Sequence, residues 1–594
     1  MTDDEDYTTS TALLEALTLS GVTHLFLNVG SDHPAILEAI SKQHLQNQPK
    51  PIRFITAPHE FVGLSAAQGY FQASGQMQAF LVHVDAGTLN MAGAIHNVAR
   101  ARIPVLVLAG TSPVTDEGEM VGSRNEFIHS IQDTIDQRGI MRGYTVYDNE
   151  IRSGKNIKQL ILRASQFAKS EPQGAAYLMA SREVLEEKIR PYDVDATRWK
   201  PTAPSALSEE SVTEIGEKLL AAKRPIVVTT YLGRDVEAVR ELVQLAEGLG
   251  VAILEAVPSH HNFPHDHPLY MGNHWSEGPR NDLLKTADLV LVIDCDVPWI
   301  KTSFKPPTTA HVYHIDIDPL KIQMSLFHID TDLSCRANSR VALHQLNTYL
   351  SDKTSSTPEL KTSVQARILE LEKVHKTYIE GFTALEAMPK NPDILTPHYV
   401  LSRLRNLLDF PTTLLLNESI SNYKPVTDVL GLHATPGSYF TSGATALGWH
   451  GGAAVGAKLA RPEKTVVAIT GDGTYLFSIP SSVHWMARRY DAPFLTVILN
   501  NRGWKSPMLS AVAVHREGWA SRVGSADQLH VTFEPGVDHA AVAVAAGAGF
   551  GAVVKSVGEV DGVLERALRT VREEGRAAVV DVWLPKFEVG DRVG

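Results

Sequence analysis

The sequence predicts an α/β protein of three doubly wound domains, each built around a parallel sheet. Short, almost uninterrupted apolar runs recur along the chain, as expected of parallel strands that are buried on both faces. Amphipathic helical stretches separate these runs, which is the alternation that α/β folds show. The 594 residues exceed what one hydrophobic core holds and suit three or four domains.

The first domain is expected over residues 1–190. Two amphipathic segments, Leu64–Ala73 and Ala92–Ala101, predict helices. Apolar runs predict buried strands at Thr23–Val29, Ile52–Ala57, Ala79–Val84 and Pro104–Ala109.

The central domain is expected over residues 200–350, and a polar, turn-rich segment at 351–375 is expected to be a linker. Ser208 is a predicted helix N-cap, because acidic residues follow it in the first turn. Strands of this domain are predicted at Ile226–Thr230, Ala252–Leu254, Leu289–Ile293 and His311–Ile315.

The third domain is expected over residues 376–594. Thr396 and Pro397 have the residue types of an N-cap and a first helical position, so they predict the start of a helix. Apolar runs predict strands at Thr413–Leu416, Thr465–Thr470, Phe494–Leu499 and Ala578–Val582.

Composition narrows the class of protein. Hydrophobic residues make up 44% of the chain and charged residues 21%, which are ordinary globular values. The net charge of −12 predicts no nucleic-acid or membrane partner, because either would require a basic surface. The two cysteines, Cys295 and Cys335, fit a reducing compartment. With an acidic N-terminus and no run of about 18 apolar residues, we expect a cytoplasmic protein.

Polar residues follow two strands of the third domain. A Gly-Asp-Gly turn at 471–473 ends one apolar run, and Asn500 and Asn501 end the next. Because the carboxyl ends of parallel strands share one edge of a sheet, these residues are expected to lie together. The carboxylate of Asp472 and the amide oxygen of Asn501 suit Mg²⁺, whose coordination is usually completed by phosphates. Either turn alone is common, but the ordered pair predicts a metal and diphosphate site.

This pair of motifs resembles the thiamine diphosphate (ThDP) binding motif of the pyruvate decarboxylase and acetolactate synthase superfamily. The resemblance implies the ThDP-enzyme fold, with pyrimidine-binding, central and diphosphate-binding domains in that order, and ThDP and Mg²⁺ as cofactors. By the resemblance, Asp472, Asn501 and the carbonyl of Gly503 hold the metal. The implied cofactor-binding residues are Glu60, Asn417, Thr445, Leu447, Gly471, Asp472, Gly473, Thr474, Asn501 and Gly503.

Two further segments carry the resemblance. Glu60, at the start of a predicted helix, resembles the glutamate that protonates the cofactor's aminopyrimidine. The segment 441–460 resembles the stretch that bends ThDP, with Leu447 as the apolar wedge and the Thr445 carbonyl as an acceptor. In this superfamily the cofactor lies between two subunits. The resemblance therefore implies a homodimer or homotetramer, in which Glu60 meets Asp472 only across an interface.

Within this superfamily, the sequence resembles two enzymes, acetolactate synthase and benzoylformate decarboxylase. Acetolactate synthases bind FAD in the central domain, but their flavin-binding pattern is replaced here by residues 294–299 (DCDVPW), so FAD is not supported. Ser31 and His83 resemble catalytic residues of benzoylformate decarboxylase, and an imidazole with a pKa near 6.5 can exchange protons at neutral pH. Trp504 and Lys505 stand where relatives place residues of the substrate pocket.

The resemblance implies an enzyme that cleaves or forms C–C bonds next to a carbonyl group. The expected reaction is acetolactate-synthase-like, in which decarboxylation of a 2-oxo acid precedes addition to a carbonyl acceptor. One alternative is a simple decarboxylase of the benzoylformate decarboxylase type, which releases an aldehyde. Another is a non-catalytic subunit with this fold, and the presence of Glu60, Asp472 and Asn501 together argues against it.

Overall fold

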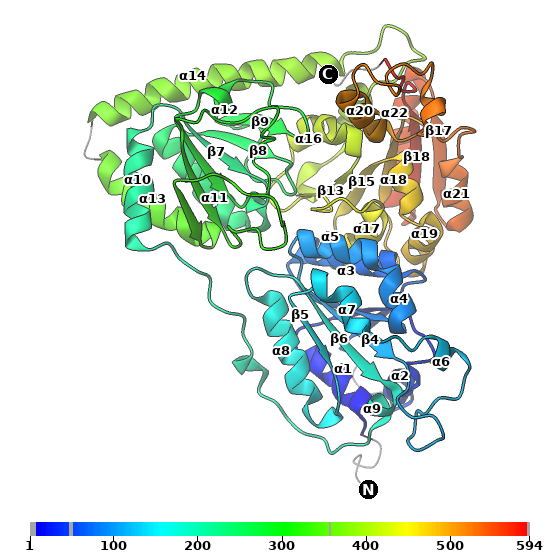
Figure 1. Ribbon diagram of the computed structural model, residues 1–594. Coiled ribbons are helices and arrows are strands. Elements are labelled where there is room, and N and C mark those ends of the chain that lie inside the picture. The colour runs from blue at the N-terminus through cyan, green and yellow to red at the C-terminus, as the bar shows by residue number, and fades with distance from the viewer. Residues whose placement is uncertain (1–6, 47–50, 356–357, 591–594) are drawn as a thin grey trace.

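The computed structural model describes residues 7–46, 51–355 and 358–590. Its three sheets each contain six parallel strands, and helices cover both faces of each sheet (Figure 1). The expected α/β architecture of three parallel-sheet domains is confirmed. Among the described helices, none combines the length and the apolar character that a bilayer crossing needs.

The first domain carries its sheet in the order β2-β1-β3-β4-β6-β5. The strands are β1 (His24–Leu27), β2 (Arg53–Thr56), β3 (Gln78–Val82), β4 (Val105–Thr111), β5 (Tyr147–Glu150) and β6 (Ala175–Ser181). The helices are α1 (Thr9–Leu19), α2 (Pro34–Leu45), α3 (Glu60–Ser74), α4 (Val84–Asn90), α5 (Ala92–Arg100), α6 (Ile128–Ile131), α7 (Gln137–Met141), α8 (Ile157–Lys169) and α9 (Arg182–Glu186).

The central domain has the strand order β12-β11-β10-β7-β8-β9, which is the order of a dinucleotide-binding fold. Its strands are β7 (Pro225–Thr229), β8 (Ala252–Ala256), β9 (Tyr270–His274), β10 (Leu289–Ile293), β11 (His311–Asp316) and β12 (Leu333–Arg336). Its helices are α10 (Glu209–Ala221), α11 (Val236–Leu249), α12 (Leu283–Thr286) and α13 (Ser339–Ser355).

The third domain repeats the topology of the first, with the order β14-β13-β15-β16-β18-β17. Its strands are β13 (Thr413–Glu418), β14 (Tyr439–Phe440), β15 (Thr465–Gly471), β16 (Leu495–Asn500), β17 (Phe550–Val554) and β18 (Ala578–Trp583). Its helices are α15 (Pro397–Leu407), α16 (Tyr423–Gly431), α17 (Trp449–Ala460), α18 (Asp472–Phe477), α19 (Pro480–Arg489), α20 (Lys505–Val514), α21 (His539–Ala546) and α22 (Val560–Arg572).

The expected linker at 351–375 is helical rather than turn-rich, so this part of the prediction needs correction. Residues 356 and 357 lie outside the described residues, and α14 (Pro358–Thr383) begins directly after them. Helix α14 begins with a proline and an acidic residue, a favourable first turn. Val364, Leu371 and Tyr378 recur at seven-residue spacing on its buried side, so packing holds the polar segment in a helix.

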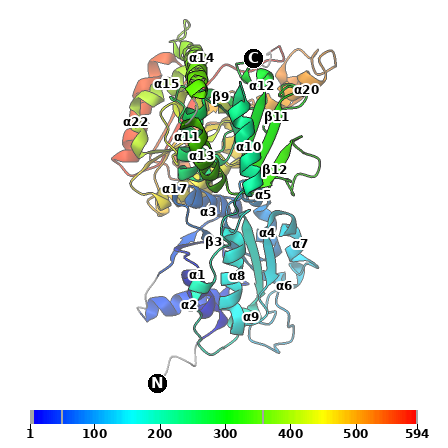
Figure 2. The ribbon, with the colours of Figure 1, turned by 90° about the vertical axis from the view of Figure 1, so that its left-hand side faces the viewer.

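The first and third domains meet where α3 crosses α17 (Figures 1 and 2). The two backbones approach so closely that a side chain at Gly69 would collide with the backbone of Ala453. A side chain at Gly456 would likewise collide with the carbonyl group of Ala66. Glycine is therefore required at this crossing, which fixes the start of α3 relative to the start of α17.

Candidate functional site

Asp472 is the first residue of α18, at the carboxyl end of β15. Asp472 is only 2% exposed, and its Oδ2 atom is buried without a hydrogen-bond partner. Burial raises the pKa of Asp472 to about 7, and the negative charge of Asp581 raises it further. Hydrogen bonds from the backbone of Gly503 and Gly473 act in the opposite direction and lower the pKa. None of the described cations forms an ion pair with Asp472. A buried carboxylate in this state calls for a bound cation.

Asn501 lies directly after β16, the strand that neighbours β15. It is 8% exposed, and its Oδ1 atom is buried without a hydrogen-bond partner. Because the backbone of Gly503 reaches the Asp472 carboxylate, the two strand ends meet as the sequence predicts. Two unpartnered buried oxygens, one from a carboxylate and one from an amide, fit the ligand chemistry of Mg²⁺.

The turn that carries Asn501 is held in place by Asp581, a residue that the sequence analysis missed. Asp581 is fully buried on β18 and accepts a hydrogen bond of 2.9 Å from Asn500 Nδ2. Asn500 Oδ1 in turn accepts from the backbone N–H of Arg502, also at 2.9 Å. Asp581 is the single acidic residue in an otherwise apolar strand, and that pattern was the available signal.

Gly473 of the Gly-Asp-Gly turn leaves room for a close neighbour. A Cβ atom at Gly473 would lie 2.7 Å from Trp504 Nε1, so the indole packs against the bare backbone. Thr474 is buried in α18, Gly471 ends β15, and Lys505 begins α20 beside Trp504. The structure thus brings Gly473 together with Trp504, one of the two predicted pocket residues.

The start of α17 is fixed by Glu418, at the end of β13. Its buried carboxylate accepts hydrogen bonds from the backbone N–H groups of Gly448, Trp449 and His450 at 2.9–3.1 Å. Leu447, which directly precedes this capped turn, is half-buried. A carboxylate at a helix N-terminus is favourable, so Glu418 holds the backbone next to Leu447.

Asn417 and Thr445 occupy different environments. Asn417 is fully buried, and its amide is already used: Nδ2 donates to Tyr439 Oη at 2.9 Å and Oδ1 accepts from Ser419 Oγ at 2.7 Å. Thr445 is exposed, and its hydroxyl lies 3.2 Å from His96 Nε2 on α5.

Glu60 begins α3 at one side of an open hollow of about 440 Å³. Its Oε2 atom accepts a 2.5 Å hydrogen bond from Asn90 Nδ2. The residues that line the hollow all belong to the first domain: Glu60, His83, Ala86, Gly87, Leu89 and Asn90.

His83 directly follows β3 and forms a pair with Asp32, a residue absent from the predicted site. Nδ1 of His83 donates a 2.5 Å hydrogen bond to Asp32 Oδ1, and the Asp32 carboxylate is buried. Burial lowers the pKa of His83, but the hydrogen bond and charge of Asp32, aided by Asp85 and Glu60, raise it overall. A side chain at Gly30 would collide with the imidazole, so glycine is needed there. Asp32 and His83 follow adjacent strands, which was the available signal.

Ser31, next to Asp32, contacts a second histidine. Its Oγ lies 3.2 Å from Nε2 of His129, and that atom also lies 3.1 Å from the buried guanidinium of Arg182. His129 belongs to the segment 113–137, which crosses the carboxyl edge of the first sheet. The structure therefore places Ser31, His83 and Glu60 along one edge of the first domain.

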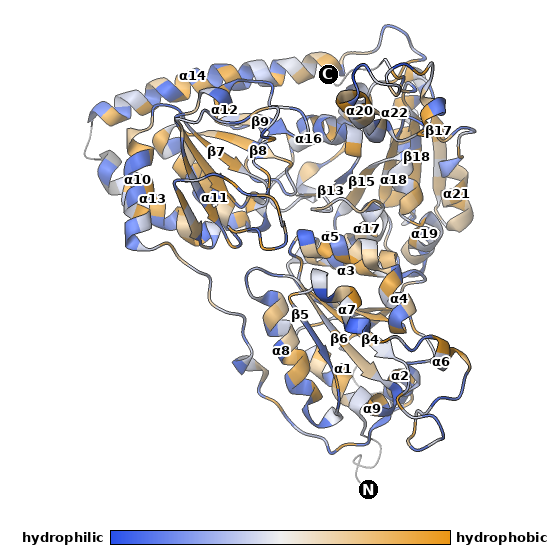
Figure 3. Cartoon of the chain, in the orientation of Figure 1, coloured by the Kyte–Doolittle hydropathy of each residue, from blue (hydrophilic) through white to orange (hydrophobic). Residues whose placement is uncertain are grey.

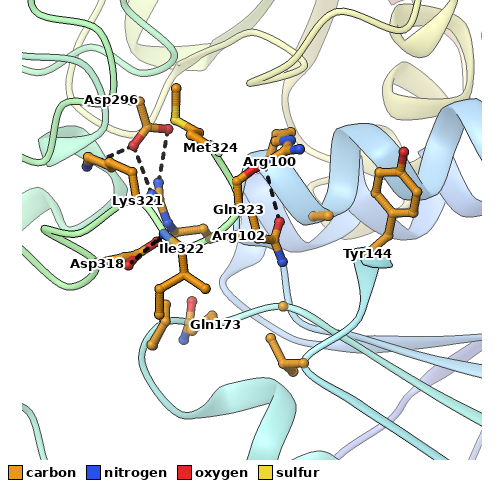
Figure 4. A pocket seen from close by; sticks show the side chains of 14 residues that line it. Arg100, Arg102, Tyr144, Gln173, Asp296, Asp318, Lys321, Ile322, Gln323 and Met324 are labelled. Carbon is orange, nitrogen blue, oxygen red and sulfur yellow. Dashed lines mark hydrogen bonds and ion pairs between the residues drawn. The ribbon is translucent and has the colours of Figure 1, made fainter. Parts of the chain in front are cut away.

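Ion pairs line the crevice of the central domain that follows β10 and β11 (Figure 4). Asp296 accepts from Arg102 of the first domain at 2.8 Å and pairs with Lys321 at 2.9 Å. Lys321 also pairs with Asp316 at 2.6 Å. Between the central strands β7 and β10, the carbonyl of Asp294 accepts directly from the N–H of Tyr231 at 2.9 Å. These residues do not favour an FAD diphosphate, because the cations Arg102 and Lys321 that line the crevice are already paired with carboxylates.

Three family models match the chain and together cover more than half of it. They describe the N-terminal TPP binding domain of thiamine pyrophosphate enzymes (residues 7–140), the central domain (212–346) and the C-terminal TPP binding domain (423–582). The chain belongs to the family of thiamine pyrophosphate enzymes, and thiamine pyrophosphate is another name for ThDP.

Similar proteins within this family differ in their reactions. Benzoylformate decarboxylase of Pseudomonas aeruginosa is 25% identical over 83% of this chain and 86% of its own length. A probable acetolactate synthase large subunit of Methanocaldococcus jannaschii is 24% identical over 83% and 80%. The solved ThDP-dependent 4-hydroxybenzoylformate decarboxylase of Rhodococcus jostii RHA1 superposes with a TM-score of 0.75 at 20% identity, covering 98% and 99% of the two chains. That last likeness establishes the fold alone.

Proposed function

We propose that the protein is a ThDP- and Mg²⁺-dependent enzyme that decarboxylates a 2-oxo acid and joins the product to a carbonyl acceptor. The observation that carries the proposal is the pair of buried, unpartnered oxygens on Asp472 and Asn501. Together with the carbonyl of Gly503, they would hold the metal that grips the diphosphate. When bound, ThDP would supply the carbanion chemistry that the side chains cannot perform.

The other residues would bind and orient the cofactor. The backbone N–H groups of residues 471–474 are suited to phosphate oxygens, and Asn417 supports the strand end beside them. Leu447, held by the capped turn after it, would set the bend of the cofactor, and the Thr445 carbonyl would accept from its amino group. Glu60 would hold the proton that activates the aminopyrimidine.

His83 and Ser31 are proposed to act on the substrate. The raised pKa of His83 suits a group that must give and take a proton near neutral pH. The Ser31 hydroxyl would orient the substrate carboxylate, and Trp504 and Lys505 would line the pocket. The Asp32–His83 pair also favours a second candidate, a decarboxylase that protonates its product to an aldehyde.

The active unit is proposed to be a homodimer or homotetramer with active sites between subunits. The hollow beside Glu60 and His83 is lined by the first domain alone, whereas the metal ligands belong to the third domain. A second copy of the chain would supply the missing half of each site.

The test is to supply pyruvate, benzoylformate and branched 2-oxo acids to enzyme reconstituted with ThDP and Mg²⁺. Release of CO₂ with a coupled product such as acetolactate would support the proposal, whereas free aldehyde alone would favour the second candidate. The variant Asp472→Asn is the control and should be inactive. Binding of ThDP without turnover of any 2-oxo acid would refute the enzymatic proposal.

We also propose that the reaction proceeds without flavin, because Arg102 and Lys321, which line the crevice, are already paired with Asp296. The absorption spectrum of the purified enzyme should lack a flavin band. A band near one flavin per chain would contradict this.

A further inference from the structure

The imidazole of His83 is held from both sides, and one of its partners has no role in the function proposed above. Nδ1 faces Asp32, while Nε2 lies 2.8 Å from Nε2 of Gln132. Gln132 follows the short helix α6. The side chain of His83 is 18% exposed, so these two contacts leave little of the ring open.

The Asp32 contact determines which ring nitrogen carries the proton. An ionised carboxylate only accepts hydrogen bonds, so Nδ1 must hold the hydrogen that bonds to Asp32. In neutral His83, Nε2 therefore carries the lone pair and accepts from the Gln132 amide. Oε1 of Gln132 is buried without a hydrogen-bond partner. Rotating the amide by half a turn would present this oxygen to a protonated Nε2.

Gln132 is well placed because the chain that follows it is tied down. Gln137 Nε2 donates to the carbonyl of Gly110 at 2.8 Å and to Tyr177 Oη at 2.9 Å. Asp133 pairs with Arg124 at 2.6 Å. The segment 113–137 thus holds the Gln132 amide against the nitrogen through which His83 would exchange protons.

We infer that Gln132 is a positioning residue that covers Nε2 of His83 and serves both of its protonation states by rotation of its amide. The contacts alone support the shielding of Nε2 by Gln132, whereas its consequence for catalysis rests on the proposed function. The charged groups that face His83 are Asp32, Asp85, Glu60 and, through Asp32, His33. Gln132 is thus an uncharged partner whose amide can either donate to Nε2 of His83 or accept from it.

The cover can be tested without substrate by diethyl pyrocarbonate, which acylates the free lone pair of neutral imidazoles. The labelling rate of His83, read by peptide mass spectrometry, should rise about tenfold or more in Gln132→Ala. Exposed His344 serves as an internal standard. Thr134→Ala, on the same segment, is the matched control and should label His83 at the wild-type rate. An unchanged rate in Gln132→Ala would overturn the inference.

Two further variants at position 132 test how Gln132 responds to protonation of His83. A glutamate at position 132 can only accept, so Gln132→Glu should raise the pKa of His83, seen in both labelling and kcat/KM, by about one pH unit. Gln132→Leu should lower it, because the protonated Nε2–H then has no acceptor and the apolar side chain disfavours the charged imidazole. If neither variant shifts the labelling profile, the inference fails. If labelling shifts but no 2-oxo acid is turned over, the proposed function fails while the cover of His83 stands.

Discussion

Asp472 makes metal binding and stability depend on pH in a defined direction. The unfolded carboxyl titrates near 3.9, whereas burial raises the pKa of Asp472 to about 7 in the folded chain. Between these values the folded chain keeps a proton that the unfolded chain has lost, so stability without metal falls as pH rises through this window. Mg²⁺ must displace that proton, so its affinity should fall up to about tenfold per pH unit below 7.

We expect Asp472→Asn to be more stable than wild type when both lack metal. The gain should be negligible below about pH 4 and reach at most about 4 kcal/mol above pH 7, as urea unfolding would measure. Calorimetry should show that the same variant loses its affinity for Mg²⁺ and ThDP. A gain that is equal at pH 4 and pH 8 would show that the carboxyl is not perturbed.

His83→Ala should lower kcat by about 10²–10⁴-fold, the range of a general acid or base. Binding of Mg²⁺ and ThDP should change far less than kcat, because the proposed metal and diphosphate ligands lie in the third domain and the side-chain partners of His83 are Asp32 and Gln132. Single-turnover kinetics and calorimetry separate these effects, and the exposed His344→Ala is the control. A wild-type kcat in His83→Ala would remove His83 from the proposed mechanism.

Candidate site residues that stand in motifs could be identified from the sequence, whereas residues that work through contacts could not. Asp472 and Asn501 stand in recognisable turns at strand ends, so they could be predicted. Asp32, Asp581 and Gln132 act by touching other side chains, and no periodicity or spacing encodes such long-range contacts.

At the scale of elements, most interior strands were predicted because they are apolar throughout, whereas the interior strand β6 and several edge strands were missed. The edge strand β5 has the sequence YDNE and is only half-buried, and it is hydrophilic in Figure 3. Pairing with β6 makes it a strand despite its composition. The opposite error occurred at α14, where polar residues form a helix because one apolar stripe packs inward.

The α3–α17 crossing predicts a sharp difference between two glycine substitutions. Gly456→Ala should cost about 1–3 kcal/mol, because the added methyl group would press on the Ala66 carbonyl. Gly248→Ala, in α11 with no neighbour within 4 Å of its added Cβ, should stabilise the protein by about 0.5–1 kcal/mol. Thermal unfolding measures both. Equal effects would mean that the crossing is looser than the structure indicates.

At the scale of the whole molecule, the first and third domains share one strand order, and each carries part of the candidate site. Glu60 and His83 lie at the edge of the first sheet, and Asp472 and Asn501 at the edge of the third. Apolar side chains are exposed around both halves, among them Phe127 and Ile131 on the first domain and Trp519 on the third. Burial of such residues between two copies would be favourable.

If each active site takes Glu60 from one chain and Asp472 from another, two inactive variants should complement each other. Glu60→Gln and Asp472→Asn homodimers each lack one required carboxylate at both sites. A mixed dimer has one site with both defects and one with neither, so the purified mixed dimer should have about half of wild-type activity. The assay is to co-express the two variants with different tags and purify through both. Activity of the purified mixed dimer no higher than that of either variant alone would place Glu60 and Asp472 in sites of a single chain.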